Sequence, residues 1–145
     1  MTNYESTERF LDTLERRDHT AVAAMLTPDA QWVFRLSVDG SPEPAIADGR
    51  DQVVARIAEI AGLLSEVRFT DRRITDAGTG TVFVQTDGDF RTSDGRPYRN
   101  VYVFRLDWRD GRLASWEEYN NPVTITRTFA MEGQLPATGN EAPAH

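Results

Sequence analysis

The segment YRNVYVFRLDWRDGRLASWEEYNNP, residues 98–122, predicts two long strands joined by a tight turn. Asp110-Gly111 marks the turn, because glycine readily takes the positive φ that a two-residue hairpin requires. Side chains alternate between the two faces of a strand, so one face of the first strand is formed by Tyr98, Asn100, Tyr102, Phe104, Leu106 and Trp108. One face of the return strand, 112–120, is formed by Trp116, Glu118 and Asn120. A glutamate between a tryptophan and an asparagine on a half-buried strand is where we expect chemistry.

The composition indicates one globular domain that does not bind nucleic acid. A chain of 145 residues can bury roughly two thirds of its unfolded surface. The net charge of −7 argues against a nucleic-acid partner, whose phosphates require a basic surface. No apolar run approaches the ~20 residues of a membrane span, and the charged N-terminus has no signal-peptide core. We therefore expect a cytoplasmic protein without a membrane partner.

Cysteine and histidine are too scarce for the usual metal sites. The chain has no cysteine and two histidines, His19 and His145, so it predicts neither a disulfide framework nor a thiolate or histidine metal cluster. We expect no metal and no cofactor. His19 falls at the predicted start of a helix, where we expect it to be exposed.

Upstream of the hairpin, the spacing of apolar residues predicts three helices and three further strands. The helices are expected at 3–17, 19–26 and 49–64, and the strands at 30–36, 66–75 and 80–91. The third helix has the clearest apolar face, formed by Val53, Val54, Ile57, Ile60, Ala61 and Leu64. Residues 37–48 contain Gly and two Pro and predict a loop, after which Asp48 could cap the third helix.

Helices followed by a long run of antiparallel strands predict an α+β fold. A strongly curved, mostly antiparallel sheet wrapped around three helices would bury both layers and leave a cone open at one end. We expect this domain over residues 1–131. Residues 132–145 are small, polar and rich in Pro and Gly, so we expect a flexible C-terminal tail there.

Several short sequences, by their order and spacing, resemble the SnoaL-like branch of the nuclear-transport-factor-two-like superfamily. They are Asp29-Ala30, Gly49-Arg50-Asp51, Gly111-Arg112-Leu113 and Trp116-Glu117-Glu118-Tyr119. The resemblance covers about residues 5–130 and implies a cystatin-like conical α+β barrel with a deep apolar pocket, commonly dimerised through its sheet. The superfamily includes polyketide cyclases, limonene epoxide hydrolases, phenazine-pathway isomerases and many members without an assigned activity.

Two branches of the superfamily point to the same glutamate. Limonene epoxide hydrolases end the corresponding strand with Trp-Arg-Asp-Tyr-Phe-Asp, and the catalytic aspartate of that pattern matches Glu118. The phenazine-pathway pattern Arg-Glu-Phe-Met-Asn-Pro is similar to residues 117–122, with its acidic residue also at Glu118. Counting back along the hydrolase pattern without a gap places its Arg-x-Asp on Gln85-Thr86-Asp87. The resemblance therefore implies a second carboxylate at Asp87.

The hydrolase branch also holds a water with a tyrosine and an asparagine on the first strand, and these positions match Trp32 and Phe34. The difference favours isomerisation, dehydration or cyclisation over hydrolysis, while epoxide opening stays open. We predict that Glu118, Asp87 and Asp89 share one apolar pocket. Carboxylates confined together cannot all ionise, so one would stay protonated and serve as the acid while another serves as the base.

The remaining pocket residues follow from the same faces and the same resemblance. We expect substrate contacts from Trp32, Phe34, Gln85, Asp89, Asn100, Tyr102, Trp116 and Asn120. Gly88 leaves an alternative register, because a bulge there would exchange which of Asp87 and Asp89 faces the pocket.

The leading hypothesis is a cofactor-free acid/base enzyme for a small hydrophobic substrate, such as a polyketide or another secondary metabolite of antibiotic biosynthesis. Glu118 and Asp87 would be its catalytic residues. The alternative is a non-catalytic small-molecule binding protein that uses the same pocket. Besides the small molecule, we expect a second copy of the chain as partner, held through the convex sheet face of Val101, Val103 and Arg105.

Overall fold

The computed structural model describes residues 1–130, so the predicted tail at 132–145 lies outside the described residues. No helix in the described part of the chain is long and apolar enough to cross a membrane. The elements, in chain order, are α1 (Asn3–Arg16), α2 (His19–Met25), β1 (Leu26–Phe34), β2 (Ala45–Asp48), α3 (Arg50–Ala61), β3 (Leu64–Glu66), β4 (Phe69–Gly78), β5 (Thr81–Thr92), β6 (Pro97–Arg109), β7 (Arg112–Asn120), α4 (Pro122–Ile125) and the π-helix η1 (Thr126–Ala130).

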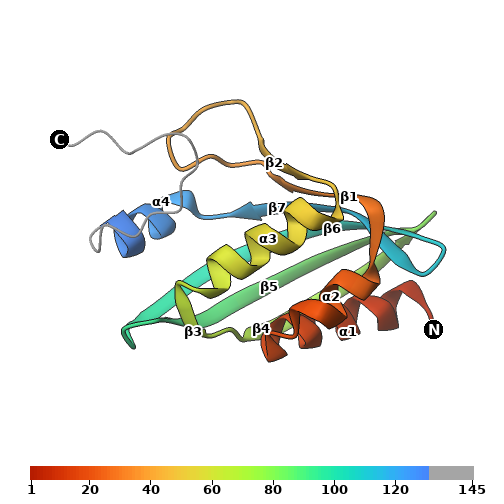
Figure 1. Cartoon of the computed structure of the whole chain (residues 1–145), viewed down its shortest axis with the longest axis horizontal. Helices are drawn as coiled ribbons and strands as arrows, with labels where there is room; N and C mark the ends of the chain where they lie inside the picture. Colours follow the sequence, from red (N-terminus) through yellow and green to blue (C-terminus); the bar gives the residue numbers. More distant parts are fainter. Residues whose placement is uncertain (131–145) are drawn as a thin grey trace.

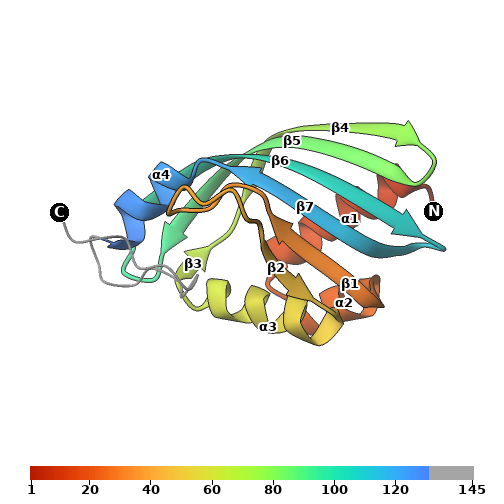
Figure 2. The same cartoon turned by 90° about the horizontal axis from the view of Figure 1, so that it is seen from above.

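Within residues 1–130, seven strands form one curved sheet in the order β2-β1-β7-β6-β5-β3, with β4 also paired to β5. The pairing of β1 with β7 is parallel and the other pairings are antiparallel. Helices α1, α2 and α3 lie along one side of this sheet, as two perpendicular views show (Figures 1 and 2). The predicted α+β cone, a curved and mostly antiparallel sheet around three helices, is confirmed.

The hairpin of β6 and β7 forms as predicted. Asp110 and Gly111 both have positive φ, 50° and 78°, which is the geometry of the favoured two-residue turn. Every second residue of β6 from Tyr98 to Trp108 is buried, so the predicted inner face is confirmed. The register places Phe104 opposite Glu118 on the neighbouring strand. Glu118 therefore points to the helix side of the sheet.

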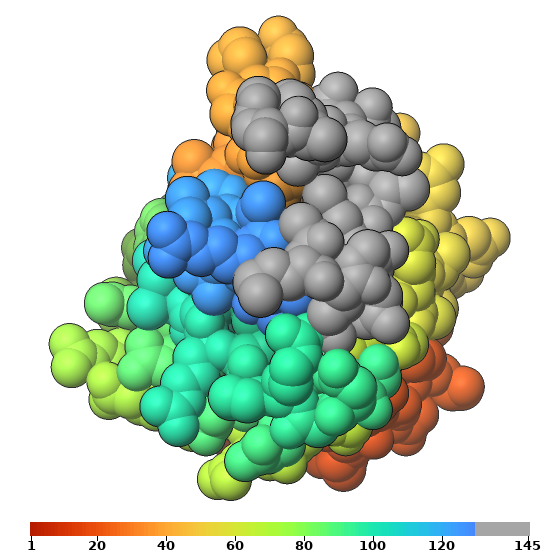
Figure 3. All heavy atoms as spheres, turned by 90° about the vertical axis from the view of Figure 1, so that its left-hand side faces the viewer, coloured from red at the N-terminus to blue at the C-terminus, as the bar shows by residue number. Residues whose placement is uncertain are grey.

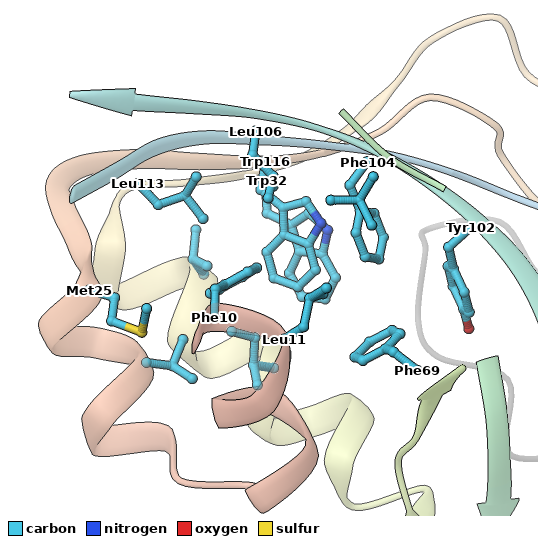
Figure 4. Packing of buried hydrophobic residues seen from close by; sticks show 14 of the residues in the cluster. Phe10, Leu11, Met25, Trp32, Phe69, Tyr102, Phe104, Leu106, Leu113 and Trp116 are labelled. Carbon is cyan, nitrogen blue, oxygen red and sulfur yellow. The ribbon is translucent and has the colours of Figure 1, made fainter. Parts of the chain in front are cut away.

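The core between sheet and helices is largely aromatic. Phe10 of α1 is fully buried and packs edge-on against Trp108 and Trp116. From α3, the buried side chains are Val53, Ile57 and Ala61, all members of the predicted apolar face. Figure 4 shows these layers, with Phe10 and Leu11 reaching up to the tryptophans of the sheet. The buried apolar residues form one contiguous cluster that extends from Val22 and Met25 of α2 to Tyr98 of β6 and Phe129 of η1.

Several boundaries differ from the prediction. Helix α3 ends at Ala61 instead of residue 64, and the strand predicted at 66–75 is replaced by β3 and β4. Strand β1 starts at Leu26, directly after α2, and ends at Phe34 instead of extending to residue 36. The predicted loop 37–48 contains β2, which pairs with β1 through Gln31 and Asp48. Pairing with a distant strand stabilised these residues, and the local Gly and Pro content does not reveal such a contact. The remaining loop, 35–44, protrudes at the end of the molecule that contains α4 (Figure 3).

Candidate active site

A cavity of about 140 Å³ lies between the inner face of the sheet and the helices. Its wall takes residues from the helices α1, α2, α3 and α4, from η1, and from every strand of the sheet except β2. Most of the wall is apolar, with rings from Phe34, Phe69, Phe90, Phe104 and Phe129. The volume exceeds that of one water many times over, so the cavity can take a small organic molecule.

Glu118 is the one carboxylate among the wall residues in the described chain. Its side chain is 5% exposed. The indole Nε1–H of Trp32 donates to Oε1 over 3.2 Å, and the amide Nδ2–H of Asn120 donates to Oε2 over 2.7 Å. Both partners are uncharged, so they orient the carboxyl without neutralising it.

Burial sets the proton affinity of this group. Loss of solvation disfavours the charged form and raises the pKa of Glu118 to about 7, although the hydrogen bonds from Asn120 and Trp32 act in the opposite direction. Near neutral pH the side chain is therefore populated both as carboxylic acid and as carboxylate. A group in this state can take a proton from one atom and give it to another.

Two tyrosines of β6, the strand that pairs with β7, line the same wall: Tyr98 and Tyr102. Asn100 Nδ2–H donates to the Tyr98 hydroxyl over 2.9 Å, and the hydroxyls of Tyr98 and Tyr102 are 3.5 Å apart. Burial raises the pKa of both phenols, and the charge of Glu118 adds to this effect. Both tyrosines therefore stay protonated and polar over the physiological range.

The tryptophans of β1 and β7 form the wall around Glu118. The rings of Trp32 and Trp116 are stacked, with centroids 3.9 Å apart and an interplanar angle of 9°. Figure 4 shows their nitrogen atoms on the same side of the stack, toward Phe104 and Tyr102. The predicted positions of Trp32, Phe34, Tyr102, Trp116 and Asn120 in the pocket wall are confirmed.

The predicted carboxylate pair does not form. Strand β5 pairs with β6 without a register shift, and Asp87 lies opposite the outward-facing Val101. Asp87 and Gln85 are exposed, and Asp89 lies on the same outer face, where it is 3.6 Å from Arg99. The predictions that Asp87, Asp89 and Gln85 face the pocket are therefore wrong.

The alternative of a bulge at Gly88 is also wrong. Gly88 faces inward opposite Asn100, and a Cβ built on it would lie 2.4 Å from Cε2 of Tyr102. The glycine is needed for this close approach of the Tyr102 ring. In the pairing of β4 with β5, the register shifts lie between Thr70 and Arg73 and between Asp76 and Gly78.

Asn100 has a different position from the one expected. It is buried, but it is not part of the cavity wall. Its Oδ1 accepts the backbone N–H groups of Val101 and Asn121 over 2.8 and 2.9 Å, while its Nδ2 reaches Tyr98. Asn100 thus positions the Tyr98 hydroxyl without lining the cavity itself.

Other wall residues were missed by sequence reasoning. His19, expected to be exposed, is partly buried and lines the cavity together with Arg17, whose guanidinium donates to the carbonyls of Ala61 and Leu64. Phe129 lies in a segment after the hairpin that had no assigned element, and only its aromatic character could have suggested burial. Within residues 1–130, no group of three or more His, Asp or Glu side chains is placed to hold a metal ion.

Comparison with known proteins places this architecture in a family. Residues 7–116 match the model of the SnoaL-like domain, a stretch that runs from α1 into β7. The chain belongs to the SnoaL-like domain family. An uncharacterized Bacillus subtilis protein, YesE, is 24% identical to this SnoaL-like chain over 128 residues, which cover 86% of this chain and 85% of YesE.

Two solved structures share the fold. A Bacillus subtilis protein provisionally named an isomerase superposes with a TM-score of 0.77 at 22% identity, covering 90% of this chain and 96% of its own. A Pseudomonas putida protein provisionally named a polyketide cyclase gives a TM-score of 0.65 at 17% identity, covering 83% of this chain and 92% of its own. At these identities, the likeness concerns the fold.

Proposed function

We propose that this SnoaL-like protein is a cofactor-free isomerase or cyclase in which Glu118 alone transfers the proton. The observation behind the proposal is a single buried carboxyl with a pKa of about 7 in the wall of an apolar cavity. An isomerisation by proton transfer needs one such group, because the proton taken from one carbon is returned to another. The provisional names of the two similar structures, isomerase and polyketide cyclase, agree with this class of reaction.

The cavity also supports a substrate class. Its aromatic and aliphatic wall favours a small and largely hydrophobic molecule, such as a polyketide fragment or another secondary metabolite. Epoxide opening by an acid/base pair is less well supported, because the second carboxylate expected at Asp87 lies on the outer face.

Solvent deuterium exchange tests the proposal without knowledge of the natural substrate. Small cyclic ketones and enones would be incubated with the protein in D₂O, and NMR would follow deuterium uptake at the carbon next to the carbonyl. We expect wild-type protein to accelerate uptake, and Glu118→Gln to lower the rate by about 10²–10⁴-fold. Glu117→Gln is the matched control, because Glu117 is the adjacent residue on the outer face, and it should retain the wild-type rate.

Binding measurements on the same variants complete the test. The intrinsic tryptophan fluorescence of Trp32 and Trp116 should report ketone binding, and Glu118→Gln should retain most of the affinity. Exchange that survives in Glu118→Gln would contradict the proposal. A wild-type protein that binds the ketones but exchanges none of them, with binding weakened by Glu118→Gln, would support the non-catalytic binding protein instead.

We also propose that the convex sheet face forms a homodimer contact. Apolar side chains gather there on β5, β6 and β7, and Val101 is 58% exposed; the group consists of Phe83, Val101, Val103 and Tyr119. A two-fold related copy would cover this patch with the same patch. Val103→Asp should shift the protein to a later elution volume in size-exclusion chromatography, whereas Val123→Asp, an exposed position on α4, should not. An unchanged elution volume for Val103→Asp would contradict the proposal.

A further inference from the structure

Two buried side-chain polar atoms in the described chain have no hydrogen-bond partner: Nε1 of Trp116 and Oδ1 of Asn120. Both residues belong to the cavity wall, and both lie on β7, two positions to either side of Glu118. Trp116 is 4% exposed and Asn120 is 9% exposed. One unpaired donor and one unpaired acceptor therefore flank the carboxyl group.

Comparable side chains elsewhere in the protein are paired. Trp32 Nε1–H donates to Glu118, and Trp108 Nε1–H donates to Thr7 Oγ1 over 3.0 Å, so Trp116 is the tryptophan with an unused N–H. Asn100 uses both its oxygen and its nitrogen, whereas Asn120 uses only its nitrogen. A buried polar group without a partner raises the free energy of the protein, so an occupant that supplies the partner gains affinity.

We propose that the substrate of the reaction proposed above carries a carbonyl-type oxygen that accepts from Trp116 Nε1–H and a hydroxyl-type group that donates to Asn120 Oδ1. The substrate class is thus a hydroxylated ketone or its enol on an apolar frame. The two contacts describe binding and hold for any ligand of this class. Only the statement that this ligand is converted by the protein rests on the proposed function.

The same geometry lets the Trp116 indole stabilise the negative charge that the proton transfer creates. The Glu118 carboxylate takes the proton from the carbon beside the carbonyl, and the electron pair of that C–H bond forms a carbon–carbon double bond. The carbonyl π pair moves to oxygen, where Trp116 Nε1–H stabilises the negative charge. In a substrate with a further carbon–carbon double bond at the β,γ position, the new double bond is conjugated with it. Glu118, now protonated, returns the proton to the γ-carbon, the double bond moves to the α,β position, and the carbonyl forms again.

Three probes of similar shape test the two contacts separately. Acetophenone has only the acceptor, 4-ethylphenol provides a hydroxyl donor, and ethylbenzene has neither group. For each variant, the affinity for a polar probe is divided by the affinity for ethylbenzene, and these ratios are compared between variants. The cost of removing the probe's polar group from water is the same for all variants and cancels in this comparison. Dissociation constants would be measured with the full chain by NMR titration.

We expect Trp116→Phe, which keeps an aromatic ring, to lower the relative affinity for acetophenone by about tenfold and to leave that for 4-ethylphenol within about twofold. Asn120→Leu should have the reverse effect. Trp108→Phe is the matched control, because it removes a buried indole N–H that already has a protein partner, and it should change neither ratio. An unchanged acetophenone ratio in Trp116→Phe, or an equal loss for both probes, would overturn the proposal.

A second readout covers the case in which Trp116→Phe does not fold. In ¹⁵N-labelled wild-type protein, acetophenone should move the indole N–H resonance of Trp116 downfield and ethylbenzene should not; equal shifts would overturn the proposal. These measurements need no turnover. Probe discrimination without deuterium exchange would retain the ligand contacts and reject the catalytic role of Glu118, and exchange without discrimination would do the opposite.

Discussion

Glu117 and Glu118 are adjacent in the chain but lie in opposite environments. Glu117 lies on the outer face, where it accepts hydrogen bonds from Arg35 over 3.0 Å and from the Tyr119 hydroxyl over 2.8 Å. The Arg35 guanidinium is the main cause that holds the pKa of Glu117 below its ordinary value. Glu118, one residue later, is buried with neutral partners, and its pKa is raised to about 7. The alternation of a strand, rather than the residue type, therefore separates a surface ion pair from a candidate proton carrier.

The largest expected effect of this difference is on the pH dependence of stability. The folded state binds the Glu118 proton more tightly than the unfolded chain, so the stabilisation is present below the ordinary pKa of 4.5 and is lost as the pH rises through about 7. The shift corresponds to about 3 kcal/mol in the free energy of unfolding. Urea denaturation of wild type and Glu118→Gln from about pH 4 to about pH 8 would measure it, since the variant lacks this titration.

Glu117→Gln is the control. The difference in the free energy of unfolding between wild type and Glu117→Gln should change with pH in the opposite direction. The pKa of Glu117 is lowered, so its contribution is present above its ordinary value and is lost as the pH falls toward the folded-state pKa. A difference between wild type and Glu118→Gln that stays constant with pH would refute the contrast between the two faces.

The next largest effect is expected at Gly88, the inward-facing residue of β5 between Asp87 and Asp89. Gly88→Ala would place a methyl group 2.4 Å from Cε2 of Tyr102 and 3.2 Å from the Phe90 ring. We expect the free energy of unfolding to fall by about 1–3 kcal/mol, as for other overpacked cores. Gly62→Ala, whose new methyl group has no neighbour closer than 3.3 Å, is the control and should change little. If Gly88→Ala were neutral, the close contact with Tyr102 would be disproved.

The smallest effect is predicted for the acidic residues of the outer face. Asp87→Asn and Asp89→Asn should each change the free energy of unfolding by less than about 0.5 kcal/mol, because both side chains lie outside the core. The deuterium exchange rate should stay within about twofold of wild type, since neither residue lines the cavity. A hundredfold loss of exchange in Asp87→Asn would restore the paired-carboxylate hypothesis.

The contrast also explains which parts could be predicted from the sequence. On β6, Arg99, Arg105 and Asp107 lie between the inward positions and define the outer face, although Val101 and Val103 on that face are apolar. Together with the Asp110-Gly111 turn, this alternation predicted the inner face of the hairpin and the position of Glu118. On β5, Val82, Phe83 and Val84 are consecutive apolar residues, so alternation does not define the inner face. The ungapped match to the hydrolase pattern then assigned Gln85 and Asp87 to the pocket, although both lie on the outer face.

Long-range contacts explain the other differences. Nothing near residue 45 indicates that β2 would pair with β1, and nothing near Asn100 indicates that its oxygen would bind the backbone of residue 121. Likewise, His19 reaches the cavity because α2 packs beside α3, which no local pattern encodes.

The most direct test of the central claim is the protonation of Glu118 itself. Carboxyl ¹³C resonances of labelled glutamate would be followed through a pH titration by NMR, with Glu118→Gln and Glu117→Gln used for assignment. We predict that the Glu118 resonance titrates at about 7, while the Glu117 resonance titrates below 4.5. A Glu118 resonance that titrates at or below 4.5 would show a carboxylate that is always ionised near neutral pH and would contradict the account.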